Sequence, residues 1–197
     1  MSAKRTAKMS RQTSETSIHV ELCLDGNGAT SVDTGIGFFD HMLETLCKHA
    51  MFDATIKAEG DLHVDAHHLV EDVGIVLGKC IDEALGERVG IARFGYAIVP
   101  MDDALLLVSV DMGGRSFFAW DVEVWAQSVG SFDVGLAEEF FRALCNNARM
   151  NLHVKKLAGK NAHHIIEAAF KALAIAIRCA VSISGCATSI PSTKGVL

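Results

Sequence analysis

The sequence predicts an α+β fold in which one unit is built twice. The first observation is a repeated heptapeptide, because AHHLVED at residues 66–72 and AHHIIEA at residues 162–168 both read Ala-His-His-x-x-Glu. The second is a wider alignment, in which residues 38–81 match residues 136–179 once two residues are deleted. The third is that both halves combine short strand-like runs with helical periodicity. Each half is therefore expected to form a small β-sheet packed with two helices.

The repeat divides one compact domain into a first half at residues 10–97 and a second half at residues 98–185. Residues 1–9 are basic and rich in serine and threonine, so we expect a flexible N-terminal arm. Residues 186–197 follow the second half as a short tail. Upstream of the helices, LCLDGNGAT (22–30) resembles VSVDMGGRS (108–116), and each run ends in Asp and a glycine-containing turn.

The elements of the first half follow from their periodicity. Residues 17–24 alternate apolar and polar side chains and predict a half-buried strand. Residues 37–50 have helical periodicity, and residues 52–58 are short and strand-like. Residues 65–86 place their apolar side chains on one face of a second helix.

The second half repeats this order. Strands are expected at residues 104–111 and 117–125, and a helix is expected at residues 135–148. A strand at residues 151–157 and a helix that begins at Ala162 complete the half.

Composition limits the class of protein. Half of the residues are hydrophobic and 21% are charged, which is typical of a globular domain and too apolar for a disordered chain. The net charge of −6 does not indicate a nucleic-acid partner, and no long apolar run indicates a membrane span. The six cysteines are dispersed and form no CxxC pair, so we expect free thiols in a reducing cytoplasm.

The paired histidines predict a metal site. Each motif opens a helix, and Asp65 and Asn161 precede the two motifs as suitable N-cap residues. At about 100° per residue, both histidines and the glutamate of each motif project to one side of the first turns. A helix N-terminus disfavours imidazolium, and neutral imidazole is the form that binds metal. A solvated patch would explain one such motif, but two equivalent copies favour metal binding.

Further donors extend this set. His41 lies early in the first helix, and His153 projects from the polar side of its strand. Together the donors suffice for two sites of three imidazoles and one carboxylate each. A set of ligands without thiolate argues against structural zinc. The softness of the donor atoms alone does not distinguish Mn, Fe, Co, Ni and Zn as the bound metal. The candidate ligands are His41, His67, His68, Glu71, His153, His163, His164 and Glu167.

An anion site is expected beside the metals. Arg93 and Arg115 lie in glycine-containing, mostly apolar stretches, where a guanidinium needs an anionic partner such as a phosphate. Lys171 lies one turn after Glu167, with a salt bridge between the two as the alternative. The tail adds two hydroxyls and a cation at Ser192, Thr193 and Lys194, although an ordinary polar turn would explain these as well.

Several long motifs resemble the imidazoleglycerol-phosphate dehydratase family, in its monofunctional form, over nearly the whole chain from about residue 11. The resemblance implies a duplicated fold of the ribosomal-protein-S5 domain 2 type, a cytoplasmic enzyme of histidine biosynthesis and two Mn(II) ions per active site. It also implies an assembly of 24 subunits with active sites between them. The motifs that carry it are TGIGFFDHML, GDLHVDAHHLVEDVGIVLG, DMGGR, AHHIIEAAFKALA and PSTKGVL.

The resemblance also implies roles for individual residues. All eight candidate ligands match the metal-binding positions of the family. We expect His41, His68, Glu71 and His164 on one ion, and the remaining four ligands on the other. The residues that match substrate and phosphate contacts are Arg93, Arg115, Lys171, Ser192, Thr193 and Lys194.

The family reaction removes water from imidazole glycerol phosphate and gives imidazole acetol phosphate, and the expected route is an imidazolate held between the two ions. Glu15 matches an acidic residue of the active site and is one candidate for proton transfer, and a metal-bound water or hydroxide is another. The two His-His-x-x-Glu motifs complete the expected catalytic residues. Two other functions remain open on the residues alone. One is a dinuclear metal hydrolase of a phosphorylated small molecule, and the other is a metal-storage cage.

Overall fold

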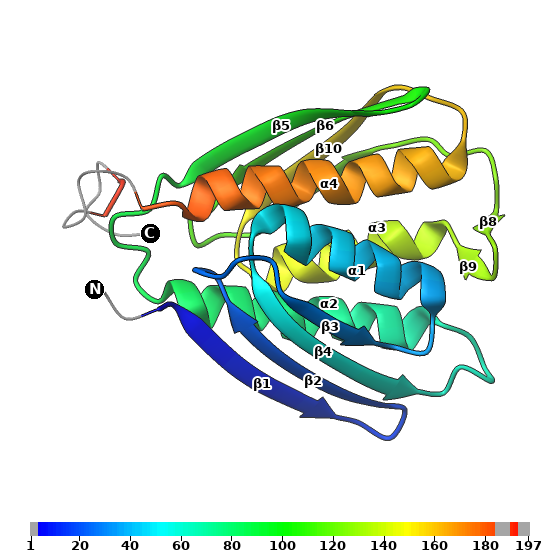
Figure 1. The fold of residues 1–197 in the computed structure, drawn as a ribbon, viewed down its shortest axis with the longest axis horizontal. Coiled ribbons are helices and arrows are strands. Elements are labelled where there is room, and N and C mark those ends of the chain that lie inside the picture. The colour runs from blue at the N-terminus through cyan, green and yellow to red at the C-terminus, as the bar shows by residue number, and fades with distance from the viewer. Residues whose placement is uncertain (1–3, 184–189, 193–197) are drawn as a thin grey trace.

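The computed structural model describes residues 4–183 and 190–192, which form two similar halves packed against each other. The first half holds a four-stranded sheet in the order β1-β2-β4-β3, with β3 parallel to β4 and the other pairs antiparallel. Two helices pack on one face of this sheet (Figure 1). The elements are β1 (Thr6–Gln12), β2 (Thr16–Cys23), β3 (Thr30–Asp33), α1 (Gly37–Ala50), β4 (Asp53–Gly60) and α2 (His67–Leu85).

The second half repeats this arrangement, with a sheet in the order β5-β6-β10-β7 and the same parallel and antiparallel pairings. A small hairpin of β8 and β9 is inserted before its first helix. The elements are β5 (Phe94–Met101), β6 (Ala104–Asp111), β7 (Phe117–Asp121), β8 (Ser128–Val129), β9 (Phe132–Asp133), α3 (Gly135–Asn147), β10 (Asn151–Ala158) and α4 (Ala162–Val181). The duplicated α+β fold is confirmed.

The helices lie between the two sheets (Figure 1). Helix α2 packs against α3 and α1 packs against α4, so the two halves share one core. Close approach of α2 and α3 depends on glycine, because a Cβ at Gly78 would lie 2.7 Å from the carbonyl oxygen of Leu144. None of the helices in the described part of the chain is long and apolar enough to cross a membrane.

All four helices begin at the same end of the molecule (Figure 1). The β1–β2 turn, the β5–β6 turn and the loops that precede α2 and α4 lie at this end too. We call it the helix-start end. Four helix N-termini there present the positive ends of their dipoles. The helix C-termini lie at the opposite end, which we call the helix-stop end.

Three expectations about boundaries are corrected. The arm expected at residues 1–9 is a β-strand from Thr6, because its N–H and C=O groups pair with β2. Strand β5 begins at Phe94, so the boundary between the halves falls before that residue and not after residue 97. Strand register places Cys23 opposite Asp53 and Asp111 opposite Asn151, so the upstream alignment that matched Asp25 with Asp111 was two residues out of register.

Candidate functional site

The centre of the candidate site is Glu167, on the second turn of α4. Its side chain is 8% exposed, and its two oxygens have different partners. Oε2 lies 3.0 Å from Nε2 of His163 and 3.6 Å from Nε2 of His41, which comes from the first turns of α1. Oε1 lies 2.8 Å from Nζ of Lys171, so the intrachain salt bridge is present. Two imidazoles and one carboxylate thus bring donor atoms within 4.8 Å of one another.

The charge state of Glu167 follows from these neighbours. Burial raises its pKa, but the hydrogen bond and charge of Lys171, the contact with His163 and the charge of His41 act in the other direction. The net pKa lies below the ordinary value, so the carboxylate is ionised at neutral pH. An ionised carboxylate is the protonation state that a metal ion requires.

A second donor group lies at the start of α2. Nδ1 of His68 is 3.3 Å from Oδ2 of Asp61, which follows β4, and 3.5 Å from Oε2 of Glu15 in the β1–β2 turn. The hydrogen bond that His68 donates to Asp61, the charge of Glu15 and further charge from Asp61 and Asp65 raise the pKa of His68. Oδ1 of Asp61 is buried without a hydrogen-bond partner, which leaves one acceptor available for a cation.

The adjacent histidines of each pair point to different neighbours. The ring centroids of His163 and His164 are 6.1 Å apart, and their planes are 79° apart. His163 faces α1, whereas His164 faces the β5–β6 turn, where its Nδ1 lies 2.7 Å from Oδ1 of Asp103. The two rings of the pair therefore have different neighbours, at the spacing of about 100° that separates successive side chains on a helix.

The expected partition of the ligands between two ions stays a prediction. His41 was expected to share an ion with His68, Glu71 and His164. Within one chain His41 instead lies beside Glu167 and His163. The reason is tertiary, since α1 packs against α4 and both helices begin at the helix-start end.

Local sequence explains how these side chains are held. The side chain of Asn161 accepts hydrogen bonds from the backbone N–H groups of His163 and His164, so the predicted cap of α4 is confirmed. At α2, Asp65 accepts a hydrogen bond from the N–H of His67 at 2.8 Å, although the helix itself begins after Ala66. Both short polar residues thereby fix the first turn from which the paired histidines project.

His67 lines a hollow of about 480 Å³ at the helix-start end. Residues that precede or begin α1, α2 and α3 surround it, among them Gly37, Asp65 and Leu136. Glu71 is half-buried one turn into α2, and it makes no hydrogen bond or ion pair with the described residues. Both side chains are therefore available to a ligand that the chain itself does not supply.

Apart from Lys171, the candidate phosphate residues lie elsewhere. Arg93 already has a bidentate partner in Asp111, at 2.7 and 3.0 Å, and its Nη1 donates to the carbonyl of Pro191. Asp111 raises the pKa of Arg93 through these hydrogen bonds. Arg115 is exposed on the loop after β6, and its guanidinium contacts no described residue. Ser192 is half-buried, while Thr193 and Lys194 lie outside the described residues.

His153 is separated from the other imidazoles. It lies on the outward face of β10, where its ring is 5.4 Å from that of Phe117. It belongs to neither donor group formed by the described residues of one chain. Its predicted orientation, away from the apolar side of the strand, is confirmed.

Sequence reasoning missed the carboxylates of Asp61, Asp102 and Asp103. Asp103 accepts hydrogen bonds from the backbone N–H groups of Lys160 and Asn161 and from His164, and these three contacts lower its pKa well below the ordinary range. Asp102 Oδ2 lies 3.4 Å from Nε2 of His164. Strand register, which differs by two residues from the sequence alignment of this region, places Asp103 opposite Glu15.

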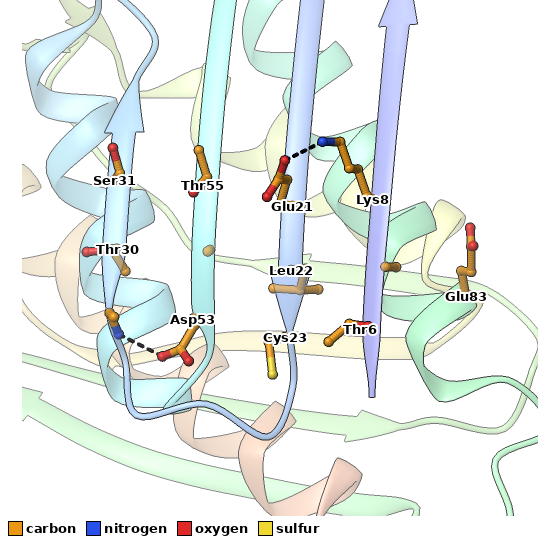
Figure 2. A pocket seen from close by; sticks show the side chains of 13 residues that line it. Thr6, Lys8, Glu21, Leu22, Cys23, Thr30, Ser31, Asp53, Thr55 and Glu83 are labelled. Atoms are coloured by element: carbon orange, nitrogen blue, oxygen red, sulfur yellow. Dashed lines mark hydrogen bonds and ion pairs between the residues drawn. The ribbon is translucent and has the colours of Figure 1, made fainter. Parts of the chain in front are cut away.

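A broad hollow of about 800 Å³ on the first sheet holds none of these donors. Figure 2 shows it beside the ends of β1, β2, β3 and β4, with Lys8 and Glu21 paired above Cys23. It contains no histidine and no pair of unengaged carboxylates. Both donor groups formed by the described residues therefore lie away from this hollow, at the helix-start end.

Comparison with known proteins agrees with this geometry. The family model described as Imidazoleglycerol-phosphate dehydratase matches residues 34–177. Imidazoleglycerol-phosphate dehydratases of Desulforamulus reducens and Acidiphilium cryptum are 58% and 56% identical to this chain, over 98% of this chain in both cases and over 98% and 99% of the relatives.

Solved structures are similar as well. The crystal structure of the Staphylococcus aureus imidazoleglycerol-phosphate dehydratase has a TM-score of 0.83 at 34% identity, over 91% of this chain and 99% of that one. The Pyrococcus furiosus structure, in complex with (S)-C348, has a TM-score of 0.84 at 43% identity, over 96% and 100%. The chain belongs to the imidazoleglycerol-phosphate dehydratase family.

Proposed function

We propose that this chain dehydrates imidazole glycerol phosphate to imidazole acetol phosphate at a site that holds two divalent metal ions. Membership in the family supports the reaction. The convergence of His41, His163 and Glu167 supports the metal, because three donors from two helices meet within 4.8 Å.

The proposed ligands suit manganese. They are six imidazoles and two carboxylates without a thiolate, and Mn(II) accepts such nitrogen and oxygen donors in octahedral geometry. Buried Glu167 and the orphaned Oδ1 of Asp61 mark two places where the fold leaves negative charge facing histidines. The proposed ligands are His41, His67, His68, Glu71, His153, His163, His164 and Glu167.

The separation of the two groups of candidate residues supports a site shared between subunits. The N–H of Arg93 donates to the carbonyl of Ala180, near the end of α4, whereas His163 lies in its first turn. At 1.5 Å per residue, about 25 Å of helix lies between these points. A five-membered ring with a three-carbon phosphate chain is far too short to contact both. A second copy must therefore bring its helix-stop end to the helix-start end of the first.

The outward face of the second sheet supports the same assembly. Phe94, Tyr96 and Ile98 of β5 and Phe117 of β7 are all more than half exposed, and Tyr96 is 75% exposed. Apolar patches of this kind mark protein interfaces. We therefore propose a homo-oligomer, with 24 subunits as the resemblance implies. The buried free thiols of Cys47, Cys80 and Cys145 support a reducing, cytoplasmic location.

The reaction requires loss of a carbon-bound proton that no carbonyl acidifies. Two divalent ions would withdraw electron density from the imidazole ring of the substrate and so ease departure of the hydroxyl beside it. Lys171 keeps the carboxylate of Glu167 ionised, and Arg115 supplies an unpaired guanidinium for the phosphate of a substrate bound by a neighbouring copy.

Glu15 is the proposed proton carrier. Its carboxylate is half exposed in the β1–β2 turn and contacts His68 at 3.5 Å without a shorter partner. It can therefore accept the carbon-bound proton and return a proton to carbon when the enol tautomerises to the ketone. The proton that the enol oxygen then loses balances the one that the departing hydroxyl takes up to leave as water.

The experiment is an assay of the purified chain with imidazole glycerol phosphate, after chelation and after addition of Mn(II). We expect a product lighter by one water, formed only by the metal-loaded chain. Full turnover by the chelated chain would contradict the metal site. Release of inorganic phosphate without the ketone would favour the hydrolase instead.

A further inference from the structure

Asp103 occupies the two-residue turn between β5 and β6, and its carboxylate makes three hydrogen bonds. Its Oδ2 accepts the backbone N–H of Lys160 at 2.7 Å and that of Asn161 at 3.1 Å. Its Oδ1 lies 2.7 Å from Nδ1 of His164. One carboxylate therefore joins the hairpin turn to the segment that enters α4 and to the ring of His164.

The internal duplication gives this residue a counterpart. Strand register aligns β1 and β2 with β5 and β6, so that Glu15 and Asp103 occupy equivalent places in the two turns. Both face Nδ1 of the second histidine in their half, His68 or His164. In each half, the equivalent hairpin turn therefore places a carboxylate next to the equivalent histidine.

The two carboxylates are held differently. Glu15 is 3.5 Å from its histidine, and the side chain accepts no hydrogen bond from the backbone. Asp103 is one methylene shorter and is fixed by two backbone N–H groups. The adjacent Asp102 adopts a left-handed φ of 46°, as residues of tight hairpin turns do. Among the described residues Asp103 thus has three hydrogen-bond partners, whereas the nearest partner of the Glu15 carboxylate lies at 3.5 Å.

This contact decides which nitrogen of His164 can bind metal. A carboxylate fixed at 2.7 Å from Nδ1 requires a proton on that nitrogen, and the lone pair of the neutral ring then lies on Nε2. Nε2 is directed toward the side where Asp102 Oδ2 lies, at 3.4 Å. Carboxylates that accept from the other nitrogen of a metal-binding histidine fix its tautomer and its orientation in this way.

We propose that Asp103 is a positioning residue, which sets the tautomer and the direction of the His164 ring so that Nε2 is presented to a metal ion. This inference rests on the proposed metal-dependent function. Asp103 itself contacts neither metal nor substrate. It acts through His164, and its counterpart Glu15 takes no such part.

The test is Asp103→Asn in the full-length chain, with Mn(II) affinity measured by calorimetry after chelation. Asparagine retains an oxygen for the backbone N–H groups of Lys160 and Asn161. Its NH₂ group then faces Nδ1, which must become the acceptor, and the proton moves to Nε2. We expect affinity at one of the two ion sites to fall about 10- to 100-fold, while the other site changes less.

The matched control is Asp53→Asn. Asp53 also accepts two backbone N–H groups, those of Asn27 and Ala29, but it contacts no histidine. This variant makes the same change in a carboxylate that accepts backbone N–H groups of a loop. It should bind Mn(II) as the unsubstituted chain does. The visible absorption of the Co(II)-loaded chains is the second readout, since it reports ligand geometry. It should change for Asp103→Asn and stay the same for Asp53→Asn.

Two failures are distinguishable. If the unsubstituted chain binds no Mn(II), the proposed function fails. If it binds two ions and folded Asp103→Asn binds them with the same affinity and Co(II) spectrum, only the role of Asp103 is wrong. If Asp103→Asn and Asp53→Asn lost Mn(II) affinity equally, the effect of Asp103 would come from holding its loop and not from orienting His164. That result would overturn the proposal as well.

Discussion

At the scale of single residues, the candidate site depends on buried or fastened carboxylates that face imidazoles. Glu167 is almost fully buried, yet it is ionised because Lys171 and two histidines surround it. Leaving such a group without partners would cost several kcal/mol, so its neighbours are part of its function. The histidines alone would form an exposed cluster, and their contacts with the carboxylates orient the imidazole rings.

Glu167→Gln tests this dependence. The amide keeps the shape of the side chain but removes the charge that faces His41 and His163. We expect Mn(II) affinity to fall at least about 10-fold and dehydration to fall about 100-fold or more. Calorimetry and the product assay measure the two effects.

The matched control is Glu138→Gln on α3. Glu138 is an exposed carboxylate that pairs with Arg142 and contacts no candidate ligand. It should leave both metal affinity and activity unchanged. Equal metal binding by Glu167→Gln and the unsubstituted chain would remove Glu167 from the ligands.

Cys47 gives a residue-scale prediction about stability. Burial, reinforced by the charge of Glu44, raises the pKa of this thiol to about 12, whereas an unfolded thiol ionises near about 8.5. Above about pH 8.5 the unfolded chain therefore loses a proton that the folded chain keeps. The free energy of unfolding should fall with rising pH from there to about pH 12, by at most about 1.4 kcal/mol per pH unit from this group.

Urea unfolding of the chain and of Cys47→Ala at pH 8 and pH 10 measures this effect. The alanine variant should lose less stability between the two pH values, although its cavity lowers stability at both. Parallel pH dependence in the two proteins would show that Cys47 is not sealed from solvent.

At the scale of elements, the two halves are joined by the packing of α2 on α3. Gly74 and Gly78 lie one turn apart on α2, and a Cβ at either position would approach α3 within 3.0 Å. The first meets Phe140 and Ala143, and the second meets Leu144 and Asn147. The helices therefore approach closely because these positions carry no side chain.

Gly78→Ala should force α2 and α3 apart. The new methyl group would lie 2.7 Å from the Leu144 carbonyl, a backbone atom that cannot rotate away. We expect a loss of about 1–3 kcal/mol in the free energy of unfolding, measured by urea titration.

Gly37→Ala is the comparison, because a Cβ at Gly37 meets nothing within 4 Å at the start of α1. It should be neutral or stabilise by less than about 1 kcal/mol. If the two variants were equally stable, the close contact of α2 with α3 would be wrong.

At the scale of the whole molecule, most metal candidates lie at one end of the chain and Arg93 and Arg115 lie toward the other, whereas Lys171 pairs with Glu167 at the metal end. The fold places all four helix N-termini at one end, where Glu167 and its histidines gather. The other end carries helix C-termini, the Arg93–Asp111 pair and the start of the tail. A complete site therefore requires two copies, each contributing a different end.

Co-expression of two inactive variants tests the shared site. Glu167→Gln should disable the metal end and Arg115→Ala the phosphate end, since exposed Arg115 contributes nothing else that its removal would disturb. In mixed assemblies with equal amounts of each chain, about one quarter of the sites combine two intact ends. We expect that fraction of normal activity after co-expression.

The controls are each variant expressed alone, which should remain inactive. Activity of the mixed assembly no greater than that of the single variants would mean that both groups act within one chain.

The sequence by itself determined the duplication, the four helices and the chemistry of the donors. Helical periodicity placed α1 at Gly37–Ala50, and the Asn161 cap marked the start of α4, because caps and apolar spacing are local properties. The repeated HHxxE motif identified the imidazoles and carboxylates. Strands β1, β3 and β5 escaped sequence reasoning because much of their side-chain pattern is exposed or short, and pairing with distant partners stabilises them.

Only the tertiary structure decided which donors meet. His41 joins Glu167 because α1 packs on α4, and His164 meets Asp103 because a hairpin turn from the same half reaches the start of that helix. It also separated Arg93 and His153 from the metal end. Sequence gives the direction of a side chain relative to its own helix or strand, whereas contacts between elements depend on how a whole core packs, which no local pattern contains.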